Sequence, residues 1–140
     1  MRQFIIKNII LLIIWFFLLG LIIYSFFKNI FIKYKLINNH KAIYLINKHK
    51  GMVFDLRKKS DYDNGHIINA IYINAINILN DNISNLCKHK KYPIILVIEN
   101  NSLGIKVANK LSNMNFNEIY ILKNGMMSWY HEKLPIVNNS

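Results

Sequence analysis

Residues 93–111, PIILVIENNSLGIKVANKL, are the part of the chain whose pattern is best suited to chemistry. Residues 94–98 have the length and composition of a buried strand, and Ile105, Ala108 and Leu111 have the spacing of one helix face. In a strand–loop–helix unit, the loop amides and the helix N-terminus converge on one point and can bind an anion. The loop residues between the strand and the helix are Glu99, Asn100, Asn101, Ser102, Leu103 and Gly104. They include no cysteine, histidine or basic side chain, so the unit has the form of a catalytic loop without a nucleophile.

Cys87 is the only cysteine, so no intrachain disulfide can form. Lys88 and His89 follow it directly and would favour its thiolate if the side chain were exposed. A lone cysteine next to Leu86 is more commonly a small core residue, and a helix C-terminus presents carbonyls, which disfavour a thiolate. Catalysis by Cys87 is therefore the weaker interpretation.

Composition limits the other kinds of site. A metal site would need two histidines at metal-ligand spacing together with a cluster of cysteine, aspartate or glutamate, and the five histidines include no such pair. We therefore expect no metal and no cofactor. The formal net charge of +11 comes mostly from lysines scattered along the chain. Nucleic-acid-binding domains gather arginine and aromatic side chains on one face, and the sequence shows no such cluster. We therefore expect no nucleic-acid partner.

Residues 8–27, NIILLIIWFFLLGLIIYSFF, contain no charge and include Ile9, Trp15, Gly20 and Phe27. A helix of about 20 residues covers about 30 Å, the thickness of the hydrocarbon core of a bilayer. The apolar region of a cleaved signal peptide is shorter and is followed by small residues at the cleavage site, which are missing here. A buried core helix would show a polar stripe. The sequence thus predicts a single membrane-spanning helix whose partner is lipid.

Charges on the two sides of this segment indicate its orientation. Arg2 and Lys7 precede it, and the residues that follow include four lysines, Lys28, Lys33, Lys35 and Lys41. The positive-inside rule places the side with more lysines in the cytoplasm, and such lysines attract anionic lipid. We expect the helix to continue from Lys28 to Lys35 through the headgroups. Residues 1–36 are accordingly assigned to the anchor, and residues 37–140 to a folded domain.

The folded domain alternates between strand and helix patterns. Strands are expected at residues 52–56, 67–73, 94–98 and 119–122. Helices are expected after a cap at Asn38 or Asn39, at residues 75–90, after residue 104 and at residues 126–133, whereas residues 58–65 are polar and typical of turns. This alternation predicts a parallel α/β sheet in three layers.

Three stretches carry motifs that recur together in one domain family. The first, VFDLRKKSDYDNGHIINAIYIN at residues 53–74, has Asp-x-Arg at a strand end, an aromatic residue, and then Gly-His-Ile. The second is the strand–loop–helix unit, and the third is EIYILKNGMMSWYHEKLPI at residues 118–136, with a tryptophan-bearing helix and Leu-Pro. In this order the chain resembles the rhodanese-like (sulfurtransferase) family over about residues 37–137. With its N-terminal span, it looks like the membrane-anchored single-domain members of Gram-negative bacteria.

The resemblance implies a three-layer α/β/α domain and a specific role for the first loop position. Active members carry a nucleophilic cysteine there, whose thiolate is stabilised by loop amides and accepts a sulfane sulfur. The flanking apolar positions place Glu99 at that position, and no arginine occurs between Glu99 and Lys106. A carboxylate cannot form a persulfide and repels anionic donors. We expect Glu99 to fold back and accept the loop's own amide hydrogens.

The remaining motif residues are expected to belong to the scaffold. Asp55 and Arg57 can hold neighbouring loops through charge-assisted hydrogen bonds, and Gly65 allows a tight turn. His66 can bind backbone at the same corner, and Trp129 suits a core anchor. Were His66 a general base instead, it would need a nucleophile in reach.

These features predict a membrane-anchored and catalytically silent rhodanese-like domain that binds other membrane or cytoplasmic proteins at the bacterial inner membrane. The alternative is a membrane-bound sulfurtransferase that transfers sulfane sulfur through a Cys87 persulfide. A third interpretation is a retained relic whose binding role has eroded.

Overall fold

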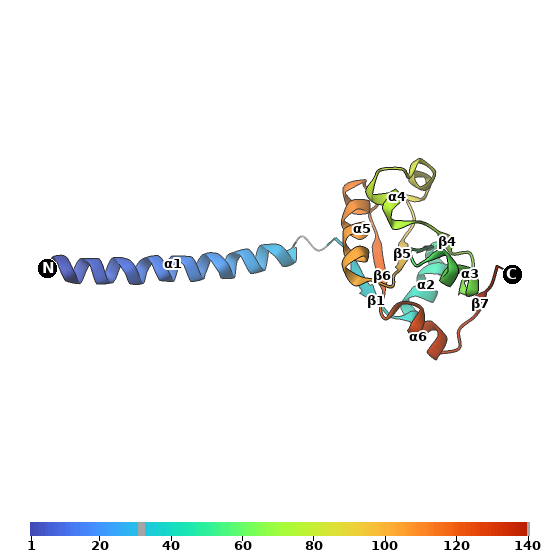
Figure 1. Cartoon of the computed structure of the whole chain (residues 1–140), viewed down its shortest axis with the longest axis horizontal. Helices are drawn as coiled ribbons and strands as arrows, with labels where there is room; N and C mark the ends of the chain where they lie inside the picture. The colour runs from blue at the N-terminus through green and yellow to red at the C-terminus, as the bar shows by residue number, and fades with distance from the viewer. Residues whose placement is uncertain (31–32, 140) are drawn as a thin grey trace. The chain divides into compact units, whose positions relative to one another are not determined.

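The computed structural model describes residues 1–30 and 33–139 and divides the chain into two compact units, Met1–Ile32 and Lys33–Ser140. The first contains a single helix, α1 (Arg2–Ile30), drawn in blue in Figure 1. Its segment Arg2–Phe27 is long and apolar enough to cross a membrane. The four residues named for the predicted span lie in this segment, and all four are exposed. An exposed apolar surface suits a helix that is solvated by lipid.

The second unit contains a five-stranded parallel sheet in the order β1-β6-β5-β2-β4. These strands are β1 (Lys35–Ile37), β2 (Met52–Asp55), β4 (Ile71–Tyr72), β5 (Ile94–Val97) and β6 (Ile119–Leu122). β5 lies at the centre, where Ile95 is opposite Val53 of β2 and Tyr120 of β6. Two further strands, β3 (His66–Ile67) and β7 (Ile136–Val137), pair antiparallel in a small separate sheet. The predicted parallel α/β fold is confirmed.

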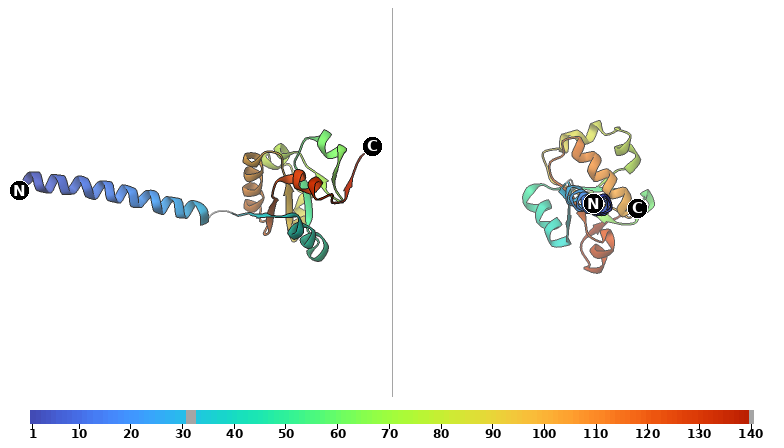
Figure 2. Two further views of the ribbon diagram at one scale, coloured as in Figure 1. Left: turned by 90° about the horizontal axis from the view of Figure 1, so that it is seen from below. Right: turned by 90° about the vertical axis from the view of Figure 1, so that its left-hand side faces the viewer.

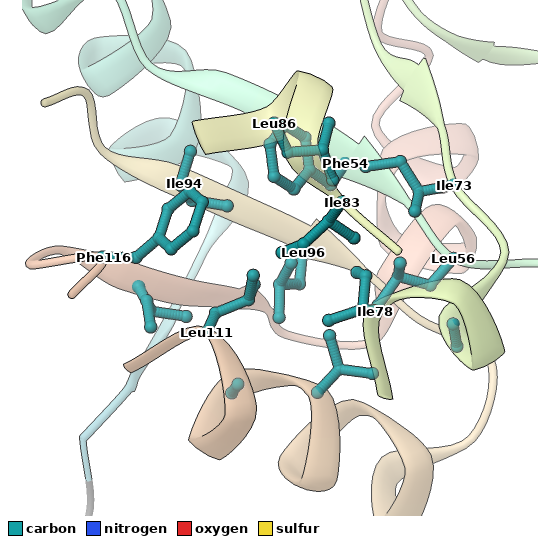
Figure 3. Close-up of a cluster of buried hydrophobic side chains, with 14 of the residues drawn as sticks. Phe54, Leu56, Ile73, Ile78, Ile83, Leu86, Ile94, Leu96, Leu111 and Phe116 are labelled. Atoms are coloured by element: carbon teal, nitrogen blue, oxygen red, sulfur yellow. The ribbon is translucent and has the colours of Figure 1, made fainter. Parts of the chain in front are cut away.

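Helices cover both faces of the sheet because successive strand residues point to opposite sides (Figures 1 and 2). Leu96 packs on one face with Phe54 and Leu111, beneath α4 (Ala75–Leu79), the 3-10 helix η1 (Ser84–His89) and α5 (Asn101–Asn113). Figure 3 shows this cluster, in which side chains of β2, β5 and α5 meet. Ile95 and Val97 pack on the other face beneath α2 (Asn39–His49), α3 (Lys59–Asn64) and α6 (Gly125–His131).

Asparagine side chains begin three of the helices that follow strands. Asn38 Oδ1 accepts a hydrogen bond from the Lys41 amide at 2.9 Å, which confirms the predicted cap of α2. Asn74 and Asn100 cap α4 and α5 in the same way. Each cap satisfies an amide that has no partner inside its helix, which defines where the helix begins.

The sheet starts earlier in the chain than predicted. α1 ends at Ile30, and Lys35–Ile37 forms β1, so the expected helical continuation from Lys28 to Lys35 is wrong. β1 pairs with β6, and the Lys123 amide donates to the Ile37 carbonyl at 2.8 Å. The predicted domain boundary after residue 36 therefore falls inside a strand. The side chain of Lys28 lies outside the described residues.

Two other predicted elements are interrupted by left-handed residues. The helix expected over residues 75–90 stops at Leu79, because Asp81 adopts φ of 61° among asparagines that favour turns, and η1 then begins at Ser84. The strand expected within residues 67–73, and centred on residues 70–73, is present as β4, but Asn69, with φ of 62°, separates it from β3. Residues 58–65, expected as turns, contain α3.

The buried face of α5 also differs from the prediction. Gly104, Val107, Ala108 and Leu111 are buried, whereas Ile105 is 38% exposed. The i, i+3, i+4, i+7 series starting at Gly104 matches the helical period more closely than a spacing of three residues. Ile105 therefore does not belong to the core.

This difference can be measured by comparing Leu111→Ala with Ile105→Ala. Leu111 is completely buried, so its truncation should lower the free energy of unfolding by about 2–5 kcal/mol. Ile105→Ala should change it by less than about 0.5 kcal/mol. Urea unfolding of the chain in mild detergent, followed by Trp129 fluorescence in a Trp15→Phe background, measures both. Equal losses would contradict the assignment of Ile105 to the surface.

Candidate functional site

The connection from β5 to α5 is short. β5 ends at Val97 and α5 begins at Asn101, so four of the six residues predicted as loop form the first helical turn. Asn100 produces this early start, because its side chain accepts from the Leu103 amide at 3.3 Å and its carbonyl accepts from the Gly104 amide at 3.0 Å. Gly104 lets the turn approach the strand end, since a Cβ there would come within 2.9 Å of Ile98 Cγ2.

Glu99 does not cap these amides. The cap is Asn100, and the Glu99 side chain is exposed. The hypothesis that Glu99 folds back onto the loop amides is therefore wrong. A neutral amide oxygen already occupies the helix N-terminus, and the carboxylate of Glu99 is free to meet a ligand or a partner.

Two hollows adjoin Glu99 at the edge of the sheet where the strands end. The first, of about 770 Å³, includes Lys58, Lys59 and Leu103 in its lining. The second, of about 590 Å³, includes Lys123 and Met127. Both are lined by Arg57, Ile98 and Glu99. Glu99 thus lies between two concave surfaces, and each of them is lined by both basic and acidic side chains.

Arg57 is held in place by the buried carboxylate of Asp55. Arg57 Nη2 lies 2.8 Å from Asp55 Oδ2, and its Nε lies 3.0 Å from Oδ1. The same Nη2 donates to the Gly65 carbonyl at 2.8 Å. Burial lowers the pKa of Arg57, but the hydrogen bond and charge of Asp55 oppose this and the net pKa is raised. The guanidinium is therefore permanently charged and already occupied, as the predicted scaffold role requires.

The Gly-His corner is joined to α6 by the same carbonyl. Tyr130 Oη donates to the Gly65 carbonyl at 3.0 Å, and a Cβ on Gly65 would lie 3.0 Å from that hydroxyl. Gly65 has an extended φ of 167°, so close approach rather than a tight turn explains the glycine. His66 Nδ1 donates to the Tyr62 carbonyl at 2.7 Å, and the two rings stack at 3.8 Å. The backbone contact predicted for His66 is confirmed.

Trp129 is the core anchor that the sequence predicted. It is 3% exposed, packs with Leu45 and Met126 beneath the sheet, and donates from Nε1 to the Pro135 carbonyl at 3.0 Å. This bond joins α6 to the segment that leads into β7. The motif residues therefore connect loops and helices around the ends of the strands.

Comparison with known proteins agrees with this geometry. Residues 38–132 match the Rhodanese-like domain. The chain belongs to the rhodanese-like domain family. It is 44% identical over 132 residues to an uncharacterized protein of Buchnera aphidicola subsp. Schizaphis graminum, covering 94% of this chain and 89% of that one. It is 36% identical over 135 residues to YibN of Escherichia coli K12, covering 96% and 94%.

Solved structures show the same fold at low sequence identity. The thiosulfate sulfurtransferase from Pseudomonas aeruginosa superposes with a TM-score of 0.63 at 13% identity, covering 75% of this chain and 20% of that one. The Alr3790 protein from Anabaena sp. superposes with a TM-score of 0.62 at 20% identity, covering 73% and 81%. These likenesses concern the fold, and the chemistry of the site has to be read from this chain.

Within the rhodanese-like domain, Cys87 lies away from the β5–α5 connection. It is half-buried in η1, just before β5, and is not among the residues that line either hollow beside Glu99. Because the strands are parallel, the start of β5 and the connection after β5 lie at opposite edges of the sheet. The sequence places Cys87 before the strand but does not reveal this separation.

Several residues of the site were missed by the sequence analysis. Asn100 was assigned to the loop rather than recognised as a cap, although asparagine before a helical pattern is a known start signal. Tyr130 had no signal besides its position next to Trp129. Lys58 and Met127 line the hollows because the segments that follow β2 and β6 lie next to the connection after β5. This proximity arises from the tertiary fold and has no local sequence signal.

The clamp between Asp55 and Arg57 should dominate local stability. Arg57→Met leaves the carboxylate of Asp55 buried without its partner and should lower the free energy of unfolding by about 3 kcal/mol. Lys59→Met is the matched control. It removes an exposed ion pair with Asp63 and should leave the unfolding midpoint nearly unchanged. The urea titration described above measures both. A loss in Lys59→Met as large as in Arg57→Met would refute the scaffold role.

Proposed function

We propose that this rhodanese-like protein is a single-pass membrane protein whose domain does not transfer sulfur and instead binds other membrane or cytoplasmic proteins at the bacterial inner membrane. The observation that carries the proposal is the identity of residue 99, in the connection after the central strand. Glu99 stands where the family resemblance places the nucleophile, and the only thiol of the chain, Cys87, is not among the residues lining either hollow.

The first turn of α5 supports the absence of catalysis. A persulfide-forming thiolate needs several unpaired amides around it, whereas the Leu103 amide is already bound by Asn100. The carboxylate of Glu99 adds a negative charge close to any anionic donor. Both features oppose binding of thiosulfate-like ions at this helix end.

Exposed apolar side chains support a role in protein binding. Met127 is 79% exposed and Leu36 is 64% exposed, and both line the second hollow beside Glu99. An apolar surface next to a free carboxylate suits a partner segment that carries a methionine- or leucine-sized side chain and a basic residue. The apolar helix α1 supports the membrane assignment, and the lysines after it support a cytoplasmic domain.

Catalysis is tested by thiocyanate formation from thiosulfate and cyanide, using the full chain in mild detergent. We expect no rate above the blank for the unchanged protein or for Cys87→Ser, with the Pseudomonas aeruginosa thiosulfate sulfurtransferase as the positive control. Activity that disappears in Cys87→Ser would overturn the proposal in favour of the Cys87 persulfide. Activity that remains in Cys87→Ser would also overturn it.

Partner binding is tested by a photo-crosslinking amino acid placed at Met127 or, as a matched exposed control, at Ile105. Irradiation of native membranes should yield discrete adducts with another protein from position 127 and none from position 105. Addition of Glu99→Lys should reduce the adduct at position 127 at least about tenfold, because a like charge would then face the basic partner. Equal adducts from both positions would exclude a specific surface beside Glu99.

A further inference from the structure

The parallel sheet collects lysines from three separate segments at the edge where the strands begin. We call this edge the entry edge and define it by seven residues: Lys33 and Lys35 at β1, Lys48 and Lys50 before β2, and Lys88, Lys90 and Lys91 before β5. Parallel strands start at the same edge, so segments that are far apart in sequence are brought together here (Figure 1). The sequence alone shows only scattered lysines.

Most of these lysines are exposed, and within the described residues 1–30 and 33–139 none of the seven forms an ion pair with a carboxylate. Six of the seven are exposed, and Lys90 is half-buried, with Nζ 5.8 Å from the centre of the Phe116 ring. Lys33 Nζ donates to Asn113 Oδ1 at 3.0 Å. The acidic groups nearby are Glu118, which accepts from Tyr120 Oη at 3.1 Å, and Asp81, which pairs with Lys110 at 2.8 Å. The entry edge therefore carries a large excess of positive charge.

The opposite edge has a different balance. Four of the seven acidic residues of the chain lie at the end of a strand or in the connection that follows it, namely Asp55, Asp61, Asp63 and Glu99. They stand beside Arg57, Lys58 and Lys59. Lys41 also lies toward this edge, because it is in the first turn of α2, directly after β1 ends. Lys106, near the start of α5, and Lys123, directly after β6, also lie at this edge. Its basic side chains are partly balanced by the four acidic ones, so the net positive charge is larger at the entry edge.

The chain itself brings the entry edge close to the end of α1. From Ile30 to Lys35 there are five Cα steps, which span at most about 18 Å even when fully extended. If α1 crosses a bilayer, as the proposed function holds, the first strand starts within this distance of the membrane surface. Lysines attract anionic headgroups at such a surface, and the attraction falls off within a Debye length.

We propose that the entry edge binds the anionic phospholipid headgroups of the membrane that α1 crosses, an inference that rests on the proposed membrane anchor. Binding at this edge leaves Glu99 and its two hollows, at the opposite edge, open to a partner. Neither arginine of the chain, Arg2 or Arg57, belongs to the entry edge, so the bidentate phosphate contacts typical of nucleic-acid-binding surfaces are missing from it.

Lysines near the last turns of α2 and η1 also complement the helix dipoles, which is a purely structural role. The two roles differ in what they respond to. A dipole contribution changes the stability of the domain in any environment. Lipid binding depends on the anionic fraction of the bilayer and is weakened by salt.

The test uses the full chain in lipid nanodiscs. A bimane fluorophore is attached to Asn117→Cys, in the exposed connection just before β6, or to Ser102→Cys, in the first turn of α5, each in a Cys87→Ser background. Nanodiscs contain phosphatidylcholine with 0 or 30% phosphatidylglycerol and a headgroup spin label that quenches nearby bimane. We expect quenching at position 117 to increase with phosphatidylglycerol and to be lost in 0.5 M salt. Position 102 should show neither change.

Charge removal at each edge provides the matched comparison. Each lysine near an anionic surface contributes about fivefold to binding, so Lys48→Gln, Lys88→Gln and Lys91→Gln together should lower the ratio of bound to unbound domain about a hundredfold. Lys41→Gln, Lys106→Gln and Lys123→Gln remove the same charge elsewhere and should change that ratio less than about twofold. Hydrogen exchange of the unlabelled chain over residues 86–92, in the two lipid mixtures, repeats the test without the added cysteines.

The outcomes separate this inference from the anchor on which it rests. If the chain fails to enter nanodiscs, the anchor is wrong. If the chain enters but quenching at position 117 does not depend on phosphatidylglycerol, lipid binding at the entry edge is refuted. It is also refuted if the two triple variants lower the ratio of bound to unbound domain equally. Displacement of the entry edge from anionic lipid by equimolar duplex DNA at 0.15 M salt would likewise overturn it, in favour of a nucleic-acid partner.

Discussion

The parallel pairing of β5 with β2 and β6 constrains every other part of the domain. Parallel strands cannot be joined by hairpins, so each connection must cross a face of the sheet, usually as a helix. Ile95 and Val97 then pack against one helical layer, and Leu96 packs against the other. The same polarity gives the sheet two chemically different edges. One receives the ends of helices and the starts of strands, and the other receives the strand ends and the caps of α2, α4 and α5.

At the edge where the strands end, side-chain contacts hold the loops around the β5–α5 connection. Asp55 fixes Arg57, Arg57 and Tyr130 converge on the Gly65 carbonyl, and Trp129 binds the Pro135 carbonyl. A buried ion pair of this kind is weak evidence for stability, but loss of one partner is costly, so it constrains local geometry. The connection after β5 differs, because Asn100 caps α5 early and Glu99 points to solvent. The ion pair and the carbonyl contacts thus surround a connection whose exposed residue, Glu99, carries a carboxylate.

The separation of the two edges gives the proposed roles a common physical basis. If α1 crosses a bilayer, as proposed, the short connection to β1 limits how far the edge where the strands begin can lie from the membrane, and the other edge is available to a partner. Lysines at the first edge and the mixed charge and apolar surface beside Glu99 at the second match this division. Neither role requires the domain to catalyse a reaction.

The sequence by itself determined features that depend on local pattern. The apolar helix α1, the buried run of β5, the Asn38 cap, the family resemblance and the position of Glu99 after the central strand were all predictable from residue types and spacing. Local pattern failed where left-handed residues such as Asn69 and Asp81 interrupted predicted elements. It also failed in α5, where a spacing of three residues was followed instead of the helical period and made Ile105 look buried.

Only the tertiary structure decided which segments meet. β1 has three residues and no recognisable pattern of its own, and it exists because β6 satisfies its backbone groups. Lys41 is close to α1 in sequence, but it follows β1 and therefore lies at the edge where the strands end. Three lysines that are farther away in sequence lie at the edge where β1 starts, namely Lys48, Lys88 and Lys91. Cys87 is separated from the β5–α5 connection by the length of a strand, for the same reason. Such long-range placement depends on strand order and direction, which sequence separation does not encode.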